Sequence, residues 1–178
     1  MILRSLALTL LLAAAGAATA QVRDEPTAVS PVTVMPPTPS PKVVATYPAQ
    51  GETIAPGVLI VKVAFDQKMN PRAWNYGAAP DSEQPECVKT PRLLNDQKTF
   101  VLLCRVLSNR TYKVALNAQP AGGFANLGDN PAETHVLTFQ VVRGELVTTV
   151  AGALKAAGLK SEDQPIEKAP EPAVRPAP

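Results

Sequence analysis

Apolar residues alternate with polar or small residues in several short runs between about residues 42 and 142. A period of two, carried by β-branched and aromatic residues, is typical of strands that bury one face. The runs VLIVKVAFD, TFVLLCRVL, TYKVALN and HVLTFQV all follow it. The positions expected to face the core are Leu59, Val61, Val63 and Phe65, then Phe100, Leu102, Cys104 and Val106, then Tyr112, Val114 and Leu116, and finally Leu137, Phe139 and Val141.

Turn-forming residues separate these runs at 49–52, 95–97, 108–109 and 122–123. Short strands at such spacing predict an all-β fold, in which two antiparallel sheets pack face to face. Each strand must then bury one side against the opposite sheet, which explains the alternation. We therefore predict one β-sandwich domain over residues 42–142.

The flanking segments have a different composition. Residues 1–20 carry one early Arg, an apolar run and the small residues Ala18-Thr19-Ala20, which is typical of a secretory signal peptide cleaved before Gln21. A retained signal anchor is the alternative. Prolines recur in 21–41, predicting a stiff, extended linker, and in 161–178, predicting a disordered tail.

Residues 143–160 change the pattern from strand to helix. Leu146, Val150 and Leu154 recur at steps of four, helix-forming alanines follow, and Gly158 can end the helix. We predict a short helix from about residue 145 to 157. Its apolar stripe either docks on the sandwich or binds a partner. Docking is favoured because so short a helix is marginal in water by itself.

The sequence contains two cysteines, Cys87 and Cys104. An even pair in an exported chain indicates a disulfide. A hairpin turning near Asn95 and Asp96 would place the two opposite each other, at a distance that a disulfide can span. Pro91 interrupts the first arm, so part of that arm must lie at an edge or a bulge. A reactive thiol is the competing interpretation, but no C-x-x-C motif supports it.

Catalytic and metal-binding residues are scarce. The single histidine, His135, begins a predicted strand, without an evident nucleophile or orienting group. One histidine and a paired cysteine do not make a zinc site, and we predict no cofactor. Gly128-Asp129-Asn130-Pro131 is interpreted as a turn. The formal net charge of +2 falls further with loss of Arg4, so no nucleic-acid or anionic-membrane partner is expected.

Several motifs resemble the bacterial Ig-like domain of the surface-layer-protein (SbsA) type. Residues 47–51, YPAQG, look like its Pro-x-x-Gly turn. FDQKMN, 65–70, looks like its Phe-Ser-x-Pro-Met-Asp segment, with Lys68 in place of the usual Pro. Leu107 with Tyr112, and LGDNPAETHVLTFQV, look like its later strand and turn motifs. Tyr112 opens a strand after a turn, so we expect a tyrosine corner, with its hydroxyl hydrogen-bonded to the preceding backbone. The resemblance implies an Ig-like β-sandwich in an exported protein, with no shared catalytic residues.

These observations predict a noncatalytic, periplasmic or secreted module. It would act as a scaffold or a protein-binding accessory for an envelope protein or surface polymer, without a stable membrane span once the signal is removed. The segment Ala64–Trp74 is then a structural corner, with Met69 and Trp74 closing one end of the sandwich and Asp66 or Asn70 bonding turn amides. The alternative is a ligand-binding or enzyme-associated domain that uses the Gly-rich loop 118–133.

Overall fold

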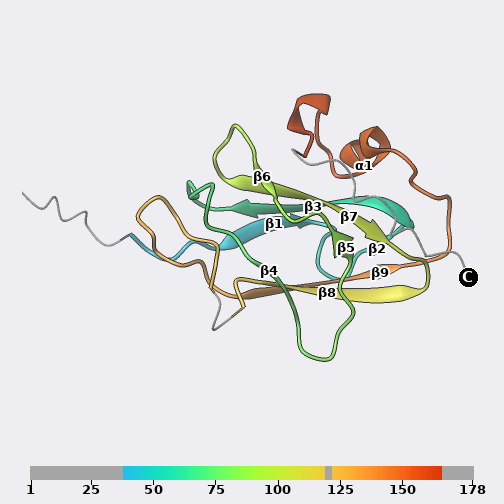
Figure 1. Ribbon diagram of the computed structural model, residues 1–178, viewed down its shortest axis with the longest axis horizontal. Coiled ribbons are helices and arrows are strands. Elements are labelled where there is room, and N and C mark those ends of the chain that lie inside the picture. Colours follow the sequence, from blue (N-terminus) through green and yellow to red (C-terminus); the bar gives the residue numbers. More distant parts are fainter. Residues whose placement is uncertain (1–37, 119–121, 166–178) are drawn as a thin grey trace, which may run out of the picture. The chain divides into compact units, whose positions relative to one another are not determined.

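Two β-sheets pack face to face in the computed structural model, which describes residues 38–118 and 122–165 (Figure 1). The predicted signal peptide, most of the predicted linker and residues 166–178 lie outside the described residues. The strands are β1 (Val43–Tyr47), β2 (Thr53–Ile54), β3 (Gly57–Phe65), β4 (Tyr76–Ala78), β5 (Glu86–Cys87), β6 (Arg92–Leu93), β7 (Thr99–Val106), β8 (Arg110–Leu116) and β9 (His135–Val141). The predicted all-β sandwich is confirmed.

The first sheet has the order β1-β3-β7-β5, and β6 also pairs with β7. The second has the order β2-β9-β8-β4. The pairings are antiparallel except that of the short strand β2 with β9, which is parallel. Consequently β4 and β5 are the last strands of their sheets.

The core between the sheets is built from the alternating positions. Val63 pairs with Phe100 across β3 and β7, while Tyr112 pairs with Phe139 across β8 and β9, and all four are at most 2% exposed. The ring of Phe124 lies 5.1–5.2 Å from the rings of Phe65, Phe100 and Tyr76. A loop residue therefore occupies the centre of the aromatic cluster.

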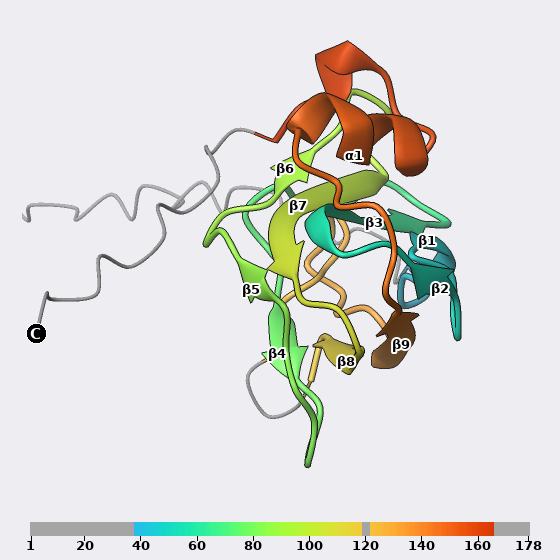
Figure 2. The same ribbon diagram turned by 90° about the vertical axis from the view of Figure 1, so that its right-hand side faces the viewer.

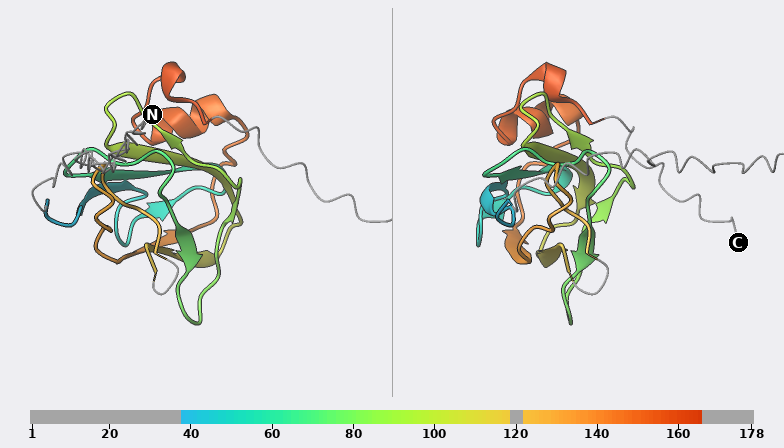
Figure 3. Two further views of the ribbon diagram at one scale, coloured as in Figure 1. Left: turned by 60° about the vertical axis from the view of Figure 1, so that its left-hand side comes forward. Right: turned by 90° about the vertical axis from the view of Figure 1, so that its left-hand side faces the viewer.

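The outer face of the first sheet is covered by the helix α1 (Val150–Ala156), as the views in Figures 1, 2 and 3 show. On that face Ile60 and Leu103 are buried, as are Leu154 and Ala157 of the helical segment. The Lys62 amino group also donates a hydrogen bond to the Ala157 carbonyl at 2.8 Å. Docking of the helix on the sandwich is thereby confirmed.

The helix is shorter at its start than predicted. Thr149 is the N-cap, and its side chain accepts a hydrogen bond from the Gly152 amide at 3.1 Å. Upstream, the Val147 amide and carbonyl bond to Pro56 and Val58 instead, at 2.8 Å each. The prediction that Leu146 belongs to the helical stripe was wrong. The neighbouring Val147 pairs with the start of β3, and this extended pairing takes the place of the first predicted helical turn.

The end of α1 agrees with the prediction. Gly158 has a positive φ of 65°, and the Leu159 amide donates to the Leu154 carbonyl at 2.9 Å. Such bonds satisfy carbonyls that the helix itself leaves free. A 3-10 helix, η1 (Ser161–Asp163), follows, and Arg92 donates to the Gln164 carbonyl at 2.6 Å. Defined structure thus extends beyond the predicted boundary at residue 160.

Tyr112 ties a strand to the turn that precedes it. Its hydroxyl accepts a hydrogen bond from the Leu107 amide at 3.0 Å, and its side chain is 2% exposed. The tyrosine-corner role expected from the sequence is confirmed. We expect Tyr112→Phe to lower the free energy of unfolding by about 1–2 kcal/mol, because the Leu107 amide loses its partner. Urea denaturation measures this. Tyr47→Phe is the matched control, and equal losses in both variants would contradict the assignment.

Candidate functional site

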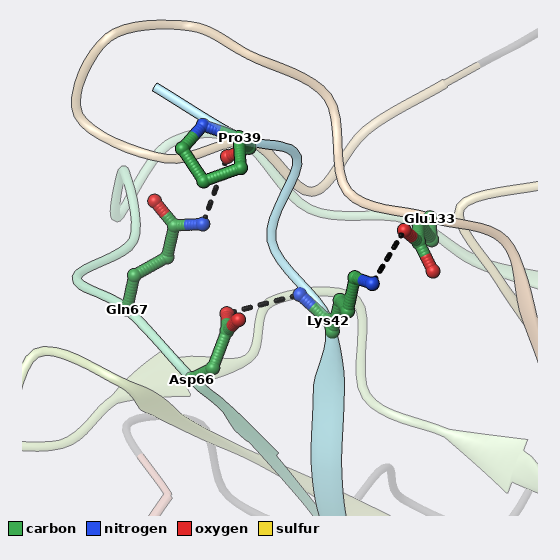
Figure 4. A network of polar contacts seen from close by, with 5 residues as sticks. All are labelled: Pro39, Lys42, Asp66, Gln67 and Glu133. Carbon is green, nitrogen blue, oxygen red and sulfur yellow. Dashed lines mark hydrogen bonds and ion pairs between the residues drawn. The ribbon is translucent and has the colours of Figure 1, made fainter.

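The segment that follows β3 holds the chain in place where it enters β1 (Figure 4). Asp66 accepts a hydrogen bond from the Lys42 amide at 3.0 Å, and Gln67 donates to the Pro39 carbonyl at 2.9 Å. Asn70 accepts from the Arg72 amide at 3.0 Å. The carboxylate and amide side chains are engaged in turn contacts, which confirms the predicted corner.

Of the two residues expected to close this end, Met69 is 1% exposed. Trp74 is half-buried and packs against the edge of the core. Met69 therefore fills the end as predicted, whereas Trp74 keeps part of its surface accessible beside β4.

The turn at 128–131 is organised by Asn126, a residue that sequence reasoning missed. Its side-chain oxygen accepts hydrogen bonds from the amides of Gly128 and Asn130 at 2.9 and 3.0 Å. Its amide group donates to Thr38 and Gln67, both at 2.9 Å. The predicted turn is confirmed, and one buried asparagine joins it to the corner and to the entering chain.

The two cysteines form a disulfide between β5 and β7, as predicted. Cys104 is 2% exposed and faces the core. The hairpin itself differs from the expectation. Its tip pairs Arg92 with Val101, so the turn centres one residue later than predicted, at Asp96 and Gln97.

The difference has a simple origin. In the first arm, Arg92 lies five positions after Cys87. Their partners in β7, Val101 and Cys104, are only three positions apart. The extra residues lie beside Pro91, where the first arm leaves the ladder. The Asp96 carboxylate closes the tip. Burial would raise its pKa, but the hydrogen bonds from Thr99 and the Lys98 amide lower the pKa below its usual range.

His135 is the first residue of β9, half-buried and opposite Leu116. Within residues 38–118 and 122–165, no three His, Cys, Asp or Glu side chains gather as a metal site would require. That His135 is an edge residue and not a catalyst stays a prediction.

The Gly-rich loop 118–133 is described except for residues 119–121. Gly123, with φ of 151°, lies so close to Trp74 and Asn75 that a side chain there would overlap them. Asn75 donates to the Gly122 carbonyl at 2.6 Å. The close approach that the glycines permit is therefore used for contact with the segment preceding β4.

A cavity of about 290 Å³ lies beside that segment, and we call it the edge cavity. Strands β4 and β5 end their sheets on this side of the sandwich (Figure 2). None of the described residues of the loop 118–133 lines the cavity. Its lining residues are Val61, Trp74, Asn75, Tyr76, Gln84, Pro85, Cys87, Val88, Lys89, Leu102 and Val114.

Tyr76 lines the cavity, and its hydroxyl is buried away from solvent. Its hydroxyl has no hydrogen-bond partner among the described residues, and its ring meets Phe124 edge-on at 5.1 Å. Burial raises the pKa of Tyr76 well above its usual value, so the group stays protonated.

A second hollow region lies at the end of the sandwich where β3 begins, and we call it the end groove. Two adjoining depressions of about 350 and 320 Å³ share Val106, Leu107 and Leu146. Leu107 and Leu146 are 57% and 58% exposed. Arg105 and Arg143 contribute to the walls, and the described lining residues include no carboxylate.

No protein-family model matches the sequence, and the comparison with curated proteins found no match. Solved structures to which the chain shows a weak similarity include the following two. Domains 1–6 of surface layer protein SbsC are 14% identical over 61% of this chain, which spans 14% of that protein, with a TM-score of 0.41. CopC from Methylosinus trichosporium OB3b is 16% identical over 60% of this chain and 98% of its own, also with a TM-score of 0.41.

Proposed function

We propose that this chain is an exported, noncatalytic Ig-like module that serves as a protein-binding accessory in the bacterial envelope. The observation that carries the proposal is the exposure of Leu107 and Leu146, each more than half accessible, over the end groove. Adjacent exposed apolar side chains mark surfaces where proteins associate.

The surroundings of these leucines define the chemistry of the partner. The apolar stripe of α1 is covered by the sheet, whereas Leu107 and Leu146 stay accessible over the groove. Arg105 and Arg143 stand at its walls. An apolar side chain flanked by carboxylates complements both features, so the partner presents an acidic segment with at least one large apolar residue.

Export is supported by the cysteines and by the N-terminal sequence. A disulfide between Cys87 and Cys104 persists in the periplasm or outside the cell. Residues 1–20 have the composition of a signal peptide. No helix within the described ranges has the length and apolar character needed to cross a membrane.

The noncatalytic part of the proposal is supported by how the polar side chains are used. Asp66, Asn70 and Asn126 hold backbone amides of their own chain, and both cysteines are bonded to each other. Groups engaged in this way stabilise turns and strands, which suits a scaffold on which a binding surface is displayed.

Affinity capture with variants of the groove tests the function. The exported chain is used to recover partners from the envelope fraction of the organism, and binding is then measured by calorimetry with the purified partner. We expect Leu107→Asp and Leu146→Asp each to weaken binding at least tenfold, because a carboxylate replaces an apolar contact beside an acidic segment.

Leu127→Asp is the matched control. Leu127 is 60% exposed but lies in the loop joined to the corner, at the other end of β3. Binding that is lost equally in the control, or kept in both groove variants, contradicts the assignment of the groove. Failure to recover any partner would leave only the scaffold role.

A further inference from the structure

We propose that β1 is the contact of a homodimer, in which the free edges of β1 from two copies of this chain pair antiparallel and continue the first sheet from one copy into the other. This contact is separate from the end groove and does not depend on the proposed function. Three features carry the proposal: a long edge strand without protecting residues, a backbone that points out of the sheet, and a strand that fits its own copy.

The first feature is the length and exposure of the edge. β1 has five residues, whereas the other strands at the sheet edges have two or three. Natural edge strands are kept short, or carry charges and prolines, which prevents pairing with other chains. β1 (VVATY) contains neither, and its Val44 is 63% exposed. A bulge at Val44 interrupts the pairing with β3, which is regular from Ala45 to Tyr47.

The second feature is the direction of the backbone at Thr46. In an antiparallel ladder, residues point their N–H and C=O groups alternately to the two sides of the strand. The Phe65 amide bonds to Lys98 on the β7 side, so the polar backbone groups of Val63 point to that side too. Thr46 lies opposite Val63, and its own amide and carbonyl therefore point away from β3. Within residues 38–118 and 122–165, no strand pairs with that side of β1.

The segment that precedes β1 does not run along this edge where the structure describes it (Figure 4). The Pro39 carbonyl accepts a hydrogen bond from Gln67, which follows β3, and the Thr38 hydroxyl accepts one from Asn126. The chain thus approaches β1 from the β3 side, away from the free edge. A further strand on this edge is therefore supplied more directly by another molecule than by this segment.

The third feature is the fit of β1 to a second copy of itself. A two-fold axis at Thr46 places the two Thr46 residues opposite each other, where they exchange both of their N–H···O=C bonds. Threonine pairs are favourable across neighbouring strands. In this register Val44 lies opposite Pro48 of the second copy, and no like charges meet within the strand, because it carries none.

The charges beside the strand complement each other in the same register. Val43 lies opposite Ala49 of the second copy, which brings Lys42 close to the turn that contains Glu52. The Glu52 carboxylate is held in that turn by a hydrogen bond from the Ala49 amide at 2.6 Å. The Lys42 side chain is 61% exposed. Each copy thus offers one cation and one carboxylate at matching ends of the contact, which favours this orientation over others.

Sedimentation equilibrium of the exported chain, with its disulfide formed, tests the contact. We expect a weak, reversible equilibrium between monomer and dimer, because the contact is small. Thr46→Pro removes the amide that points out of the sheet and should weaken dimerisation at least about tenfold. Proline is tolerated on an edge strand where its N–H is not used in the sheet, so the monomer should melt at nearly the same temperature.

Val44→Lys is a second variant, which places a charge on the edge as natural edge strands do. It should weaken dimerisation at least about fivefold. Val142→Lys is the matched control at another exposed valine, outside β1, and should dimerise as the wild type does. Lys42→Glu and Glu52→Lys should each weaken dimerisation, and the two changes together should restore it.

The proposal is overturned if the wild type stays monomeric up to about 1 mM, as it would if a different chain or the N-terminal segment covered the edge. It is also overturned if Thr46→Pro dimerises as tightly as the wild type, or if Val44→Lys and Val142→Lys behave alike. Leu146→Asp, in the end groove, should leave the dimer intact. Loss of the dimer in that variant would place the contact at the groove instead of β1.

Discussion

Replacing Cys87 and Cys104 together by alanine is expected to lower the free energy of unfolding by about 3 kcal/mol. The cysteines are separated by 17 positions, and their bond restricts the unfolded chain around the hairpin that carries β6. Cys104 is also buried, so alanine leaves a small void beside β3. Equilibrium denaturation in urea at matched protein concentration measures the loss.

Reduction of the wild-type protein is the control for this variant. Breaking the same bond with a thiol reductant removes the crosslink without removing either sulfur atom. The reduced protein should be more stable than the double alanine variant, because it has no void. It should be less stable than the oxidised protein, because its unfolded chain is no longer crosslinked. Identical midpoints for oxidised and reduced protein would show that the crosslink contributes no stability.

Phe124→Ala is expected to cost about 3–5 kcal/mol of the free energy of unfolding, which is the range for truncating a buried aromatic side chain. Phe124 is 0% exposed, and its ring packs at 5.1–5.2 Å against the rings of Phe65, Phe100 and Tyr76. The three neighbouring rings belong to both sheets, so a void there weakens the contact between the layers. Urea or thermal denaturation followed by circular dichroism is the measurement.

Two further variants define how the result is interpreted. Phe124→Leu keeps most of the volume and should lose clearly less stability than the alanine variant. Leu127→Ala changes an exposed residue of the same loop and should change stability by about 0.5 kcal/mol or less. If Phe124→Ala were as stable as Leu127→Ala, the aromatic cluster would not be the centre of the core.

The strands were predictable because their pattern is local. Alternation along VLIVKVAFD and TFVLLCRVL identifies which side chains share a face, and the structure buries those faces. The same reasoning applies to Tyr112, whose place after a turn indicated its hydrogen bond to the backbone. Neither conclusion requires knowledge of any distant contact.

The register of the hairpin shows where local reasoning fails. The pairing of Cys87 with Cys104 was predicted, yet the turn lies one residue later than expected. Between these two pairs the first arm has more residues than β7, and the extra residues near Pro91 keep Cys87 opposite Cys104 despite the shifted turn. A bulge costs little at the edge of a sheet, so the sequence does not reveal how many residues it absorbs.

The candidate sites were largely hidden from the sequence. The edge cavity gathers side chains from β3, β7 and β8 with residues of the 74–76 and 84–89 segments. Phe124 and Asn126 sit in a stretch that contains glycines and turn residues, which suggested a ligand loop. Their burial depends on a sheet and a corner far away in the sequence.

What the sequence determined by itself is the β-class of the fold, its inward faces, its cysteine pair and the docking of its C-terminal helix, because hydrophobic periodicity and turn chemistry act over a few residues. The tertiary structure alone decided which loop fills the core, which leucines remain exposed, and where a buried tyrosine hydroxyl has no hydrogen-bond partner among the described residues. Those outcomes depend on how two layers and a helix fill a shared volume, and packing in three dimensions leaves no periodic signal along the chain.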